Sequence, residues 1–270
     1  MDRTALIQCF MDTMRRVRED PVLSEAARRT QAGTVLYLAG YTAILRPVKS
    51  QGFPVSVVED TTFHCAGNLV DGTGRVAVLN FANAYRPGGG VLHGAMAQEE
   101  CLCRSSSLYC ALSLPYLAAN YYNYNSKAVG DLGSDAVIYS PRVTVIKSDD
   151  DLPVPLDVPF EVDVLTCAAP YVNPDRKKPI PMETLRKAVT RRIRNIFEVA
   201  MANGVDDLVL GAFGCGAFNN PPDMVAECFR QLLADEDYAG HFRRVVFAIK
   251  ADPARRANYD TFRQILNPRH

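Results

Sequence analysis

Several features that mark well-known protein classes are missing from this 270-residue chain. No run of about 18 apolar residues occurs, so the sequence predicts no membrane span. Thirty basic and thirty acidic residues cancel, which leaves no overall charge to hold a nucleic-acid backbone. The ends carry neither the pattern of a secretion signal nor a lipidation motif. We therefore expect a cytoplasmic or nuclear protein without a membrane or sequence-specific nucleic-acid partner.

The spacing of ligands for a metal ion is also absent. The eight cysteines include no Cys-x-x-Cys pair, and the four histidines stand far apart. Cys101 and Cys103 are two positions apart in an expected helix, so they would point to different faces. The sequence predicts reduced, mostly buried thiols and no metal or other cofactor.

Two common nucleotide-binding motifs are missing as well. The chain has no early Gly-x-Gly-x-x-Gly of a dinucleotide-binding fold, and no glycine-rich loop ends in Lys-Ser or Lys-Thr. A nucleotide-dependent dehydrogenase is therefore a distant alternative.

The pattern of apolar residues that is present predicts an α/β fold. Two N-terminal helices precede a series of β-branched strands, and strands and helices alternate late in the chain. This alternation predicts a mixed, largely parallel sheet with helices on both faces. The expected strands are 34–38, 55–58, 75–81, 136–139, 143–146, 162–166, 207–211 and 244–249. The expected later helices are 98–112, 181–203, 222–233 and 253–266.

One stretch of the chain fits neither period. Residues 119–135 are polar and rich in Tyr and Asn, and Gly130 and Gly133 close the stretch. We interpret it as a solvated surface loop or insertion. A flap over a substrate, formed by residues 116–124, is the alternative.

Two glycine-rich loops each follow an expected central strand and precede a helix, which is where ligands of open α/β sheets bind. The first contains three successive glycines, 88–90, and ends in the adjacent carboxylates Glu99 and Glu100. Glycines let the backbone approach a ligand closely. Neighbouring carboxylates raise each other's pKa, which keeps a proton donor available near neutral pH, whereas the helix dipole favours the charged form. The second loop, 211–221, offers free amides ahead of a helix, as a diphosphate requires.

The first loop resembles the signature of the microbial-type poly(ADP-ribose) glycohydrolases, which belong to the macrodomain superfamily. The match consists of the glycines 88–90, seven further residues and Gln98-Glu99-Glu100, supported by Asn80-Phe81-Ala82, Arg104-Ser105-Ser106 and the later loop 211–218. The resemblance implies a three-layer α/β/α macrodomain fold. Residues 1–32 would form an N-terminal helical extension, and residues 33–270 a macrodomain-like catalytic domain. It also implies metal-independent hydrolysis of the ribose–ribose O-glycosidic bond, with release of ADP-ribose from chain ends.

The resemblance assigns roles to residues in both loops. Glu100 would be the general acid that protonates the departing ribose oxygen and then activates water. Glu99 would hold the hydroxyls of the distal ribose. Further substrate contacts would come from Asn83, Gly88, Gly89, Gly90, Val91, Gln98, Gly214, Cys215, Gly216, Ala217 and Phe218.

The adenine site is less defined by the sequence. Asp60 follows an early strand, where macrodomains place an acidic residue against the adenine amino group, but a helix cap explains it equally well. Asn258 and Phe262 are further candidates to border the adenine, and packing of an amphipathic helix also explains Phe262.

Three residues depart from the family pattern and leave the preferred substrate open: Asn83, Arg86 and His93. One alternative is an enzyme that removes single ADP-ribose units from proteins or nucleic acids. Another is a module that binds ADP-ribose without cleaving it, although such a module has no need for the carboxylates of Glu99 and Glu100. We expect a monomer whose partner is ADP-ribose polymer or an ADP-ribosylated macromolecule.

Overall fold

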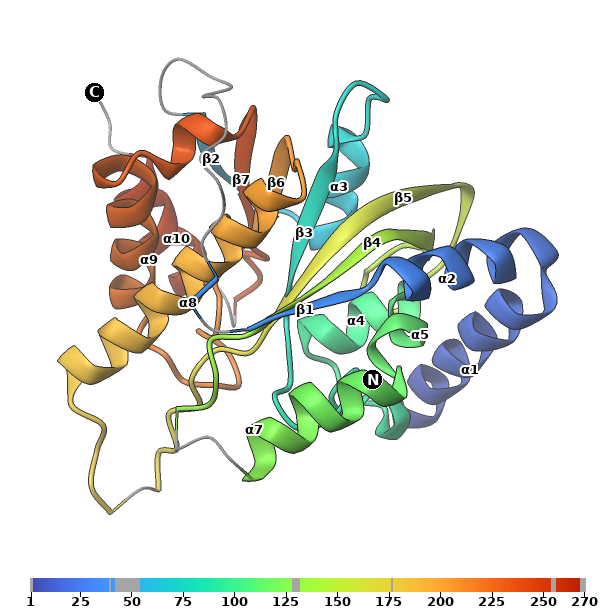
Figure 1. Ribbon diagram of the computed structural model, residues 1–270, viewed down its shortest axis with the longest axis horizontal. Coiled ribbons are helices and arrows are strands. Elements are labelled where there is room, and N and C mark those ends of the chain that lie inside the picture. The colour runs from blue at the N-terminus through green and yellow to red at the C-terminus, as the bar shows by residue number, and fades with distance from the viewer. Residues whose placement is uncertain are drawn as a thin grey trace.

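The computed structural model describes residues 2–38, 40–41, 54–127, 132–175, 177–253 and 256–267. The strands among them form one seven-stranded mixed sheet (Figure 1). Five neighbouring strands run parallel, and the antiparallel strand β4 separates them from β1. In sheet order the strands are β1 (Val35–Tyr37), β4 (Val137–Lys147), β5 (Pro155–Cys167), β3 (Val76–Phe81), β6 (Asp207–Leu210), β7 (Arg244–Ala248) and β2 (Val55–Val58).

Helices cover both faces of this sheet, which confirms the three-layer α/β/α arrangement expected from the sequence (Figure 1). One layer contains α8 (Met182–Ala202), α9 (Pro222–Arg230), η3 (Gln231–Asp235), η4 (Tyr238–His241) and α10 (Arg256–Leu266). The other contains α1 (Arg3–Glu19), α2 (Pro21–Gly33), α3 (Thr62–Leu69), η1 (Val91–His93), α4 (Gln98–Ser105) and α5 (Leu108–Leu112), followed by α6 (Pro115–Leu117), η2 (Ala118–Tyr122) and α7 (Asn123–Lys127). None of the helices in the described ranges combines the length and apolar character needed to cross a membrane.

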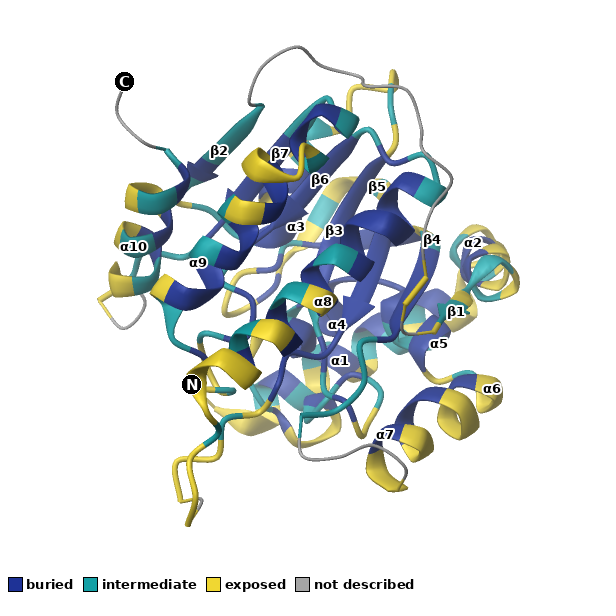
Figure 2. Cartoon of the chain, turned by 60° about the vertical axis from the view of Figure 1, so that its left-hand side comes forward, coloured by how far each residue is buried: buried dark blue, intermediate teal, exposed yellow. Residues whose placement is uncertain are grey.

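The central strand β3 shows why the sheet is buried on both sides. Its successive side chains alternate between the two layers: Ala77 and Leu79 belong to the core under α8, whereas Val76 and Val78 belong to the core under α3 and α4. All four are almost fully buried, and Figure 2 shows the same for the other central strands. A strand that packs helices on both faces reads as a continuous apolar run, as residues 76–79 do.

The interpretation of residues 119–135 as a solvated insertion is wrong over residues 119–127. This part folds into the π-helical turn η2 and the helix α7. Tyr121 and Tyr122 are 1% and 3% exposed and pack in the core beside α4. A π-helical turn places its buried residues off the 3.6-residue period, which hides it from a search for helical periodicity. Gly130 lies outside the described residues.

Further boundaries also differ from those expected, among them the start of β5, which lies at Pro155 instead of residue 162. The strands predicted at 136–139 and 143–146 form one strand, β4, because a register shift between Ser140 and Val143 absorbs the interruption. The helix predicted over 98–112 divides into α4 and α5, because Ser106 leaves the helix and bridges to Val145 of the sheet. Short-range periodicity does not report such long-range pairings.

The N-terminal helices pack closely against the rest of the described chain. Phe10 is buried in the core that contains α3 and α4. The Thr13 hydroxyl donates to the carbonyl of Arg104 at 2.5 Å. The Lys147 ammonium, 3% exposed, lies 2.9 Å from an Asp12 carboxylate oxygen. These contacts attach α1 to both α4 and β4.

Candidate active site

Strand β3 brings the first polar side chain of the site into the core. The alternation of β3 places Asn80 on the α4 side of the sheet, where it is fully buried. Its amide nitrogen donates to Glu99 Oε1 at 3.3 Å and to the Thr166 hydroxyl of β5 at 3.1 Å. The end of β3 is thereby connected to the start of α4.

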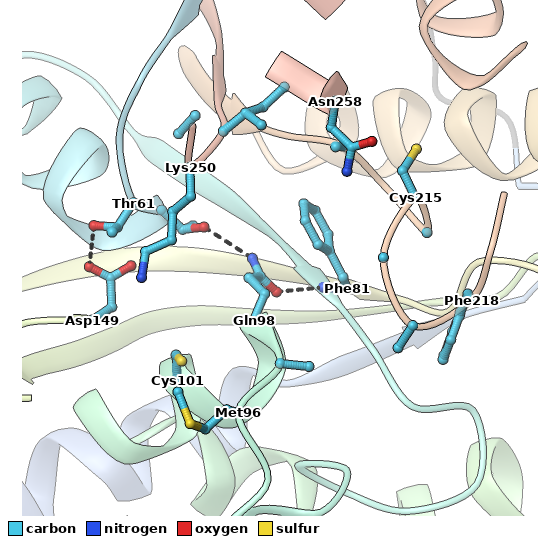
Figure 3. A pocket seen from close by; sticks show the side chains of 18 of the residues that line it. Thr61, Phe81, Met96, Gln98, Cys101, Asp149, Cys215, Phe218, Lys250 and Asn258 are labelled. Carbon is cyan, nitrogen blue, oxygen red and sulfur yellow. Dashed lines mark hydrogen bonds between the residues drawn. The ribbon is translucent and has the colours of Figure 1, made fainter. Parts of the chain in front are cut away.

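The side chain of Gln98 fixes the start of α4 to the sheet. Its Oε1 accepts the Phe81 N–H at 2.9 Å, and its Nε2 donates to the Leu79 carbonyl at 2.8 Å and to the Thr62 hydroxyl at 3.1 Å. The amide thus continues the hydrogen bonding of β3 beyond the last strand pair. Gln98 also lines the larger cavity described below, where Figure 3 shows it near the centre.

Glu99 is the more deeply buried of the two adjacent carboxyls, at 2% exposure. Its Oε2 accepts the backbone N–H of Asn83 at 2.7 Å. Burial in the core and the nearby Glu100 carboxyl raise the pKa of Glu99 from 4.5 to about 8, against the lowering effect of the Asn83 N–H. Glu99 therefore carries a proton at neutral pH.

Glu100 has one bonded and one unbonded carboxyl oxygen. Its Oε1 accepts the N–H of Gly90 at 2.8 Å. Its Oε2 is buried and has no hydrogen-bond partner among the described residues. Leaving a buried carboxyl oxygen unpaired costs about 1–3 kcal/mol or more, so this oxygen is a candidate to bond a ligand.

The triple glycine brings the loop backbone directly against both carboxyls. Gly88 and Gly89 adopt the left-handed region, at φ 65° and 58°. A Cβ on Gly89 would overlap Glu100 Oε1 and lie 3.2 Å from Glu99 Oε2. The loop therefore requires glycine here both for conformation and for space.

Asn83 serves the loop with its side chain. Its Oδ1 accepts the N–H groups of Tyr85 and Arg86 at 2.8 and 3.0 Å, which forms a local turn. The other two residues that depart from the family pattern, Arg86 and His93, are exposed. The structure thus gives Asn83 a role in loop geometry in addition to the ligand contact predicted for it.

The second glycine-rich loop follows β6 at the same edge of the sheet. Gly214 has φ 73°, and a Cβ there would come within 2.6 Å of the Asn220 amide nitrogen. Gly216 is exposed, and a Cβ there would meet nothing within 4 Å. The buried Asn220 amide bonds the carbonyls of Pro170 and Gly214 and holds the loop in this shape. The thiol of Cys215 has a raised pKa because of burial, so it is protonated.

A cavity of about 560 Å³ lies beside this loop, at the carboxyl ends of β2, β7, β6 and β3 (Figure 3). Thr61 and Asp149 lie on one side of it and Cys215 and Asn258 on the other, with Phe218 beyond Cys215. The residues predicted from the sequence that line it are Asp60, Gln98, Gly214, Cys215, Gly216, Ala217, Phe218 and Asn258.

The helix-cap interpretation of Asp60 is wrong, because the N-cap of α3 is Thr61 and the first amides of the helix bond Asp149. Asp60 lines the larger cavity, and its carboxylate also accepts the N–H of Thr61 and contacts His64 Nδ1, each at 2.7 Å. The main cap of α3 is Asp149, whose oxygens accept the Phe63 N–H at 2.7 Å and the Thr61 hydroxyl at 2.6 Å. Asp149 comes from a distant loop, so no local motif indicated it.

The structure separates the predicted residues into two groups. Asn83, the glycines 88–90, Glu99 and Glu100 are in mutual contact, and buried Val91 packs in the core beside them. Neither carboxyl lines the larger cavity, but Gln98, which precedes Glu99 in the chain, does. Phe213 and Phe262 are fully buried core residues, whereas Phe218 is half-buried and lines the cavity.

Several lining residues were given no role in the site from the sequence. Phe81 and Met96 flank Gln98 (Figure 3). Lys250, which follows β7, binds Asp151 at 2.8 Å. The alternation of strands could have indicated Phe81, but the positions of Met96 and Lys250 depend on the three-dimensional course of their loops. Within the described ranges, no group of three or more His, Cys, Asp or Glu is arranged to hold a metal ion.

A smaller cavity of about 220 Å³ adjoins the larger one. Ala169 and Phe218 line both cavities, and Asn83 lines the smaller one. Since the Asn83 N–H is bonded to Glu99, the carboxyl pair lies close to the smaller cavity as well.

Comparison with known proteins places this geometry in context. The model of the microbial-type PARG catalytic domain matches residues 13–148, which contain the first glycine-rich loop and both carboxyls. No curated protein matches the sequence.

Three solved structures are similar over nearly the whole chain. The poly(ADP-ribose) glycohydrolase of Thermomonospora curvata has 30% identity and a TM-score of 0.81, covering 97% of this chain and 99% of that one. The same enzyme bound to the inhibitor ADP-HPD has 32% identity and a TM-score of 0.80, with the same coverage. The poly(ADP-ribose) glycohydrolase of Deinococcus radiodurans in complex with ADP-ribose has 33% identity and a TM-score of 0.76, covering 89% of this chain and 97% of that one.

Proposed function

The chain belongs to the family of microbial-type poly(ADP-ribose) glycohydrolases, and we propose that Glu100 is the acid with which it cleaves its substrate. The protein is a glycosidase that hydrolyses the ribose–ribose O-glycosidic bond of poly(ADP-ribose) and releases ADP-ribose. The proposal concerns which residues carry out this reaction.

One observation carries the assignment of Glu100: its Oε2 is buried without a partner while its Oε1 is held by the Gly90 N–H. A carboxyl fixed at one oxygen has a defined orientation, and its free oxygen can donate a proton to a ribose oxygen. After the glycosidic bond breaks, the same oxygen accepts a proton from the water that attacks the oxocarbenium-like ribose.

We assign Glu99 to orienting the distal ribose. Its carboxyl is anchored by the Asn83 N–H and the Asn80 amide, so it is rigid without any substrate. A rigid, protonated carboxyl in a dry environment can both donate to and accept from a sugar hydroxyl.

The larger cavity is the proposed site for the rest of the terminal ADP-ribose unit. The open space above Gly216 suits a diphosphate bonded by the loop amides. Phe218 offers a half-buried ring to a ribose, and Asp60 and Asn258 are proposed to border the adenine. The volume of about 560 Å³ is in the range of sites that enclose a ligand of this size.

Some expectations from the sequence stay predictions. These are the division between a helical extension and a catalytic domain at residue 33, cleavage from chain ends, the monomeric state, metal independence and a cytoplasmic or nuclear location.

The proposal is tested by following the release of ADP-ribose from poly(ADP-ribose) by the wild type and by Glu100→Gln. Removal of an acid–base group lowers kcat by about 10²- to 10⁴-fold. The amide keeps the shape of the carboxyl, so the affinity for free ADP-ribose is expected to stay within about threefold. A variant that releases ADP-ribose at the wild-type rate would exclude Glu100 as the acid.

A further inference from the structure

The two cavities meet at Ala169 and Phe218 and extend over different strand ends. The larger cavity is lined mainly by the ends of β2, β7, β6 and β3, whereas the smaller one is lined mainly by residues after β3, after β5 and before β4. Asn80 and Asn83, at the end of β3, bind Glu99. Because Gln98 of the larger cavity precedes Glu99 in the chain and Asn83 of the smaller cavity bonds Glu99, a substrate whose scissile bond is at the pair would extend into both cavities.

The smaller cavity contains a buried cation with an unused donor. Arg192 of α8 is 1% exposed and lines the cavity. Its Nε donates to the Ser134 carbonyl at 2.9 Å, and its Nη2 donates to the Leu132 carbonyl. Its Nη1 has no partner among the described residues. The Nε also lies 3.6 Å from an Asp135 carboxylate oxygen, so the guanidinium has a counter-charge, and its free Nη1 suits a ribose hydroxyl or a phosphate oxygen.

A second unused donor lines the same cavity. The Ser134 hydroxyl is buried and also lacks a partner within the described part of the chain. Arg192 and Ser134 come from different elements, α8 and the loop before β4, and the guanidinium bonds the Ser134 backbone. The two donors are therefore held in a fixed relation that suits neighbouring oxygens of one ligand.

Two exposed aromatic rings complete the lining. Tyr85 is 51% exposed and Tyr171 is 45% exposed. Tyr171 packs edge-on against Phe218, with ring centroids 5.9 Å apart, so its position is fixed. Exposed aromatic rings beside unpaired donors are typical of sites for a base attached to a sugar or phosphate.

We propose that the smaller cavity binds the adenosine of the ADP-ribose unit on the leaving side of the scissile bond. This inference rests on the proposed function, because the oxygen that departs from the distal ribose is the 2′-oxygen of that adenosine. Arg192 and Ser134 donate to its ribose or phosphate oxygens, and Tyr85 and Tyr171 pack against its adenine. An ADP-ribose linked to an amino-acid side chain lacks this adenosine, so the cavity favours polymer over mono-modified acceptors.

The test compares two substrates with the same terminal ADP-ribose and different leaving groups. One is the ribose–ribose-linked ADP-ribose dimer, and the other is ADP-ribose carrying 4-nitrophenol at the anomeric carbon in the same configuration. For Tyr85→Ala and Arg192→Lys, we expect kcat/KM for the dimer to fall about 10- to 100-fold, and for Ser134→Ala about 3- to 10-fold. For the nitrophenyl glycoside we expect each to stay within about threefold, since that leaving group does not use the cavity.

Matched controls are Tyr116→Ala, a 48% exposed tyrosine that lines neither cavity, and Arg194→Gln, an arginine of α8 that pairs with Glu236. Both are expected to cleave the two substrates like the wild type. Equal losses of kcat/KM on the two substrates would overturn the inference. Wild-type kcat/KM on the dimer for both Tyr85→Ala and Ser134→Ala would also overturn it. Tyr85 is exposed and Ser134→Ala is a small change, so this second outcome can be read even if Arg192→Lys unfolds. Failure of the wild type to cleave either substrate would instead overturn the proposed function.

Discussion

Glu99 and Glu100 are neighbours in the chain but have different environments. Glu99 is anchored at both oxygens and raised in pKa by burial, whereas Glu100 keeps one oxygen unbonded within the described structure. The sequence showed that two carboxyls sit at a helix start, and it left open whether their mutual repulsion or the helix dipole decides their pKa. Burial, which no local pattern reports, decides it for Glu99.

The raised pKa of Glu99 predicts how stability depends on pH. Between its ordinary value of 4.5 and about 8, the folded protein holds a proton that the unfolded chain releases. The contribution of the Glu99 carboxyl to stability is therefore fully present below pH 4.5. The free energy of unfolding falls as the pH rises towards about 8.

Urea denaturation of the wild type and Glu99→Gln over this pH range measures the effect. We expect the difference in unfolding free energy between variant and wild type to shift in favour of the variant as the pH rises. A difference that is the same at every pH would show that Glu99 titrates normally.

At the scale of elements, two glycine-rich loops and one helix cap shape the site. The loops were predicted from the sequence because glycine has a local conformational meaning. The cap of α3 was not, because Asp149 lies 86 residues from the Phe63 amide that it binds. The same limit explains why Arg192 of α8 received no role: its partners are 58 and 60 residues away.

The second loop allows a prediction that separates folding from binding. Gly214→Ala places a Cβ against Asn220 at a φ of 73°, so it is expected to destabilise the protein by about 1–3 kcal/mol. Gly216→Ala meets only open space and is expected to change stability by less than about 0.5 kcal/mol. Its methyl group occupies the proposed diphosphate space, so ADP-ribose affinity is expected to fall about tenfold or more.

Thermal unfolding and calorimetric titration of both variants check these expectations. Wild-type affinity in a folded Gly216→Ala would argue against a diphosphate at this loop.

At the scale of the whole molecule, the sequence predicted the layers and the mixed sheet because long apolar runs and alternating elements depend on short-range order. It did not predict how closely the N-terminal helices join the rest. The buried Lys147 of β4 binds Asp12 of α1 and the Cys9 carbonyl, each at 2.9 Å. This bond to Lys147 lowers the pKa of Asp12 to about 2. The contribution of Asp12 to the stability of the fold is therefore present above pH 3.8, its ordinary pKa, and is lost as the pH falls towards 2.

Loss of Asp12 is therefore expected to weaken the entire fold. Asp12→Ala leaves the buried ammonium of Lys147 without its counter-charge and should lower the unfolding free energy at pH 7 by about 1–3 kcal/mol. The control Glu19→Ala removes only exposed pairs, with Arg15 and Arg18, and should cost less than about 0.5 kcal/mol. Chemical denaturation that finds equal effects for the two variants would show that the Lys147 contact contributes nothing.

The central claim is that Glu100 gives a proton to the departing ribose oxygen. The most direct measurement is kcat/KM of the wild type and Glu100→Gln on the ADP-ribose dimer and on the nitrophenyl glycoside, whose leaving group departs without a proton. The account predicts that the loss on the dimer exceeds the loss on the glycoside by about tenfold or more. Equal losses on both substrates would contradict it.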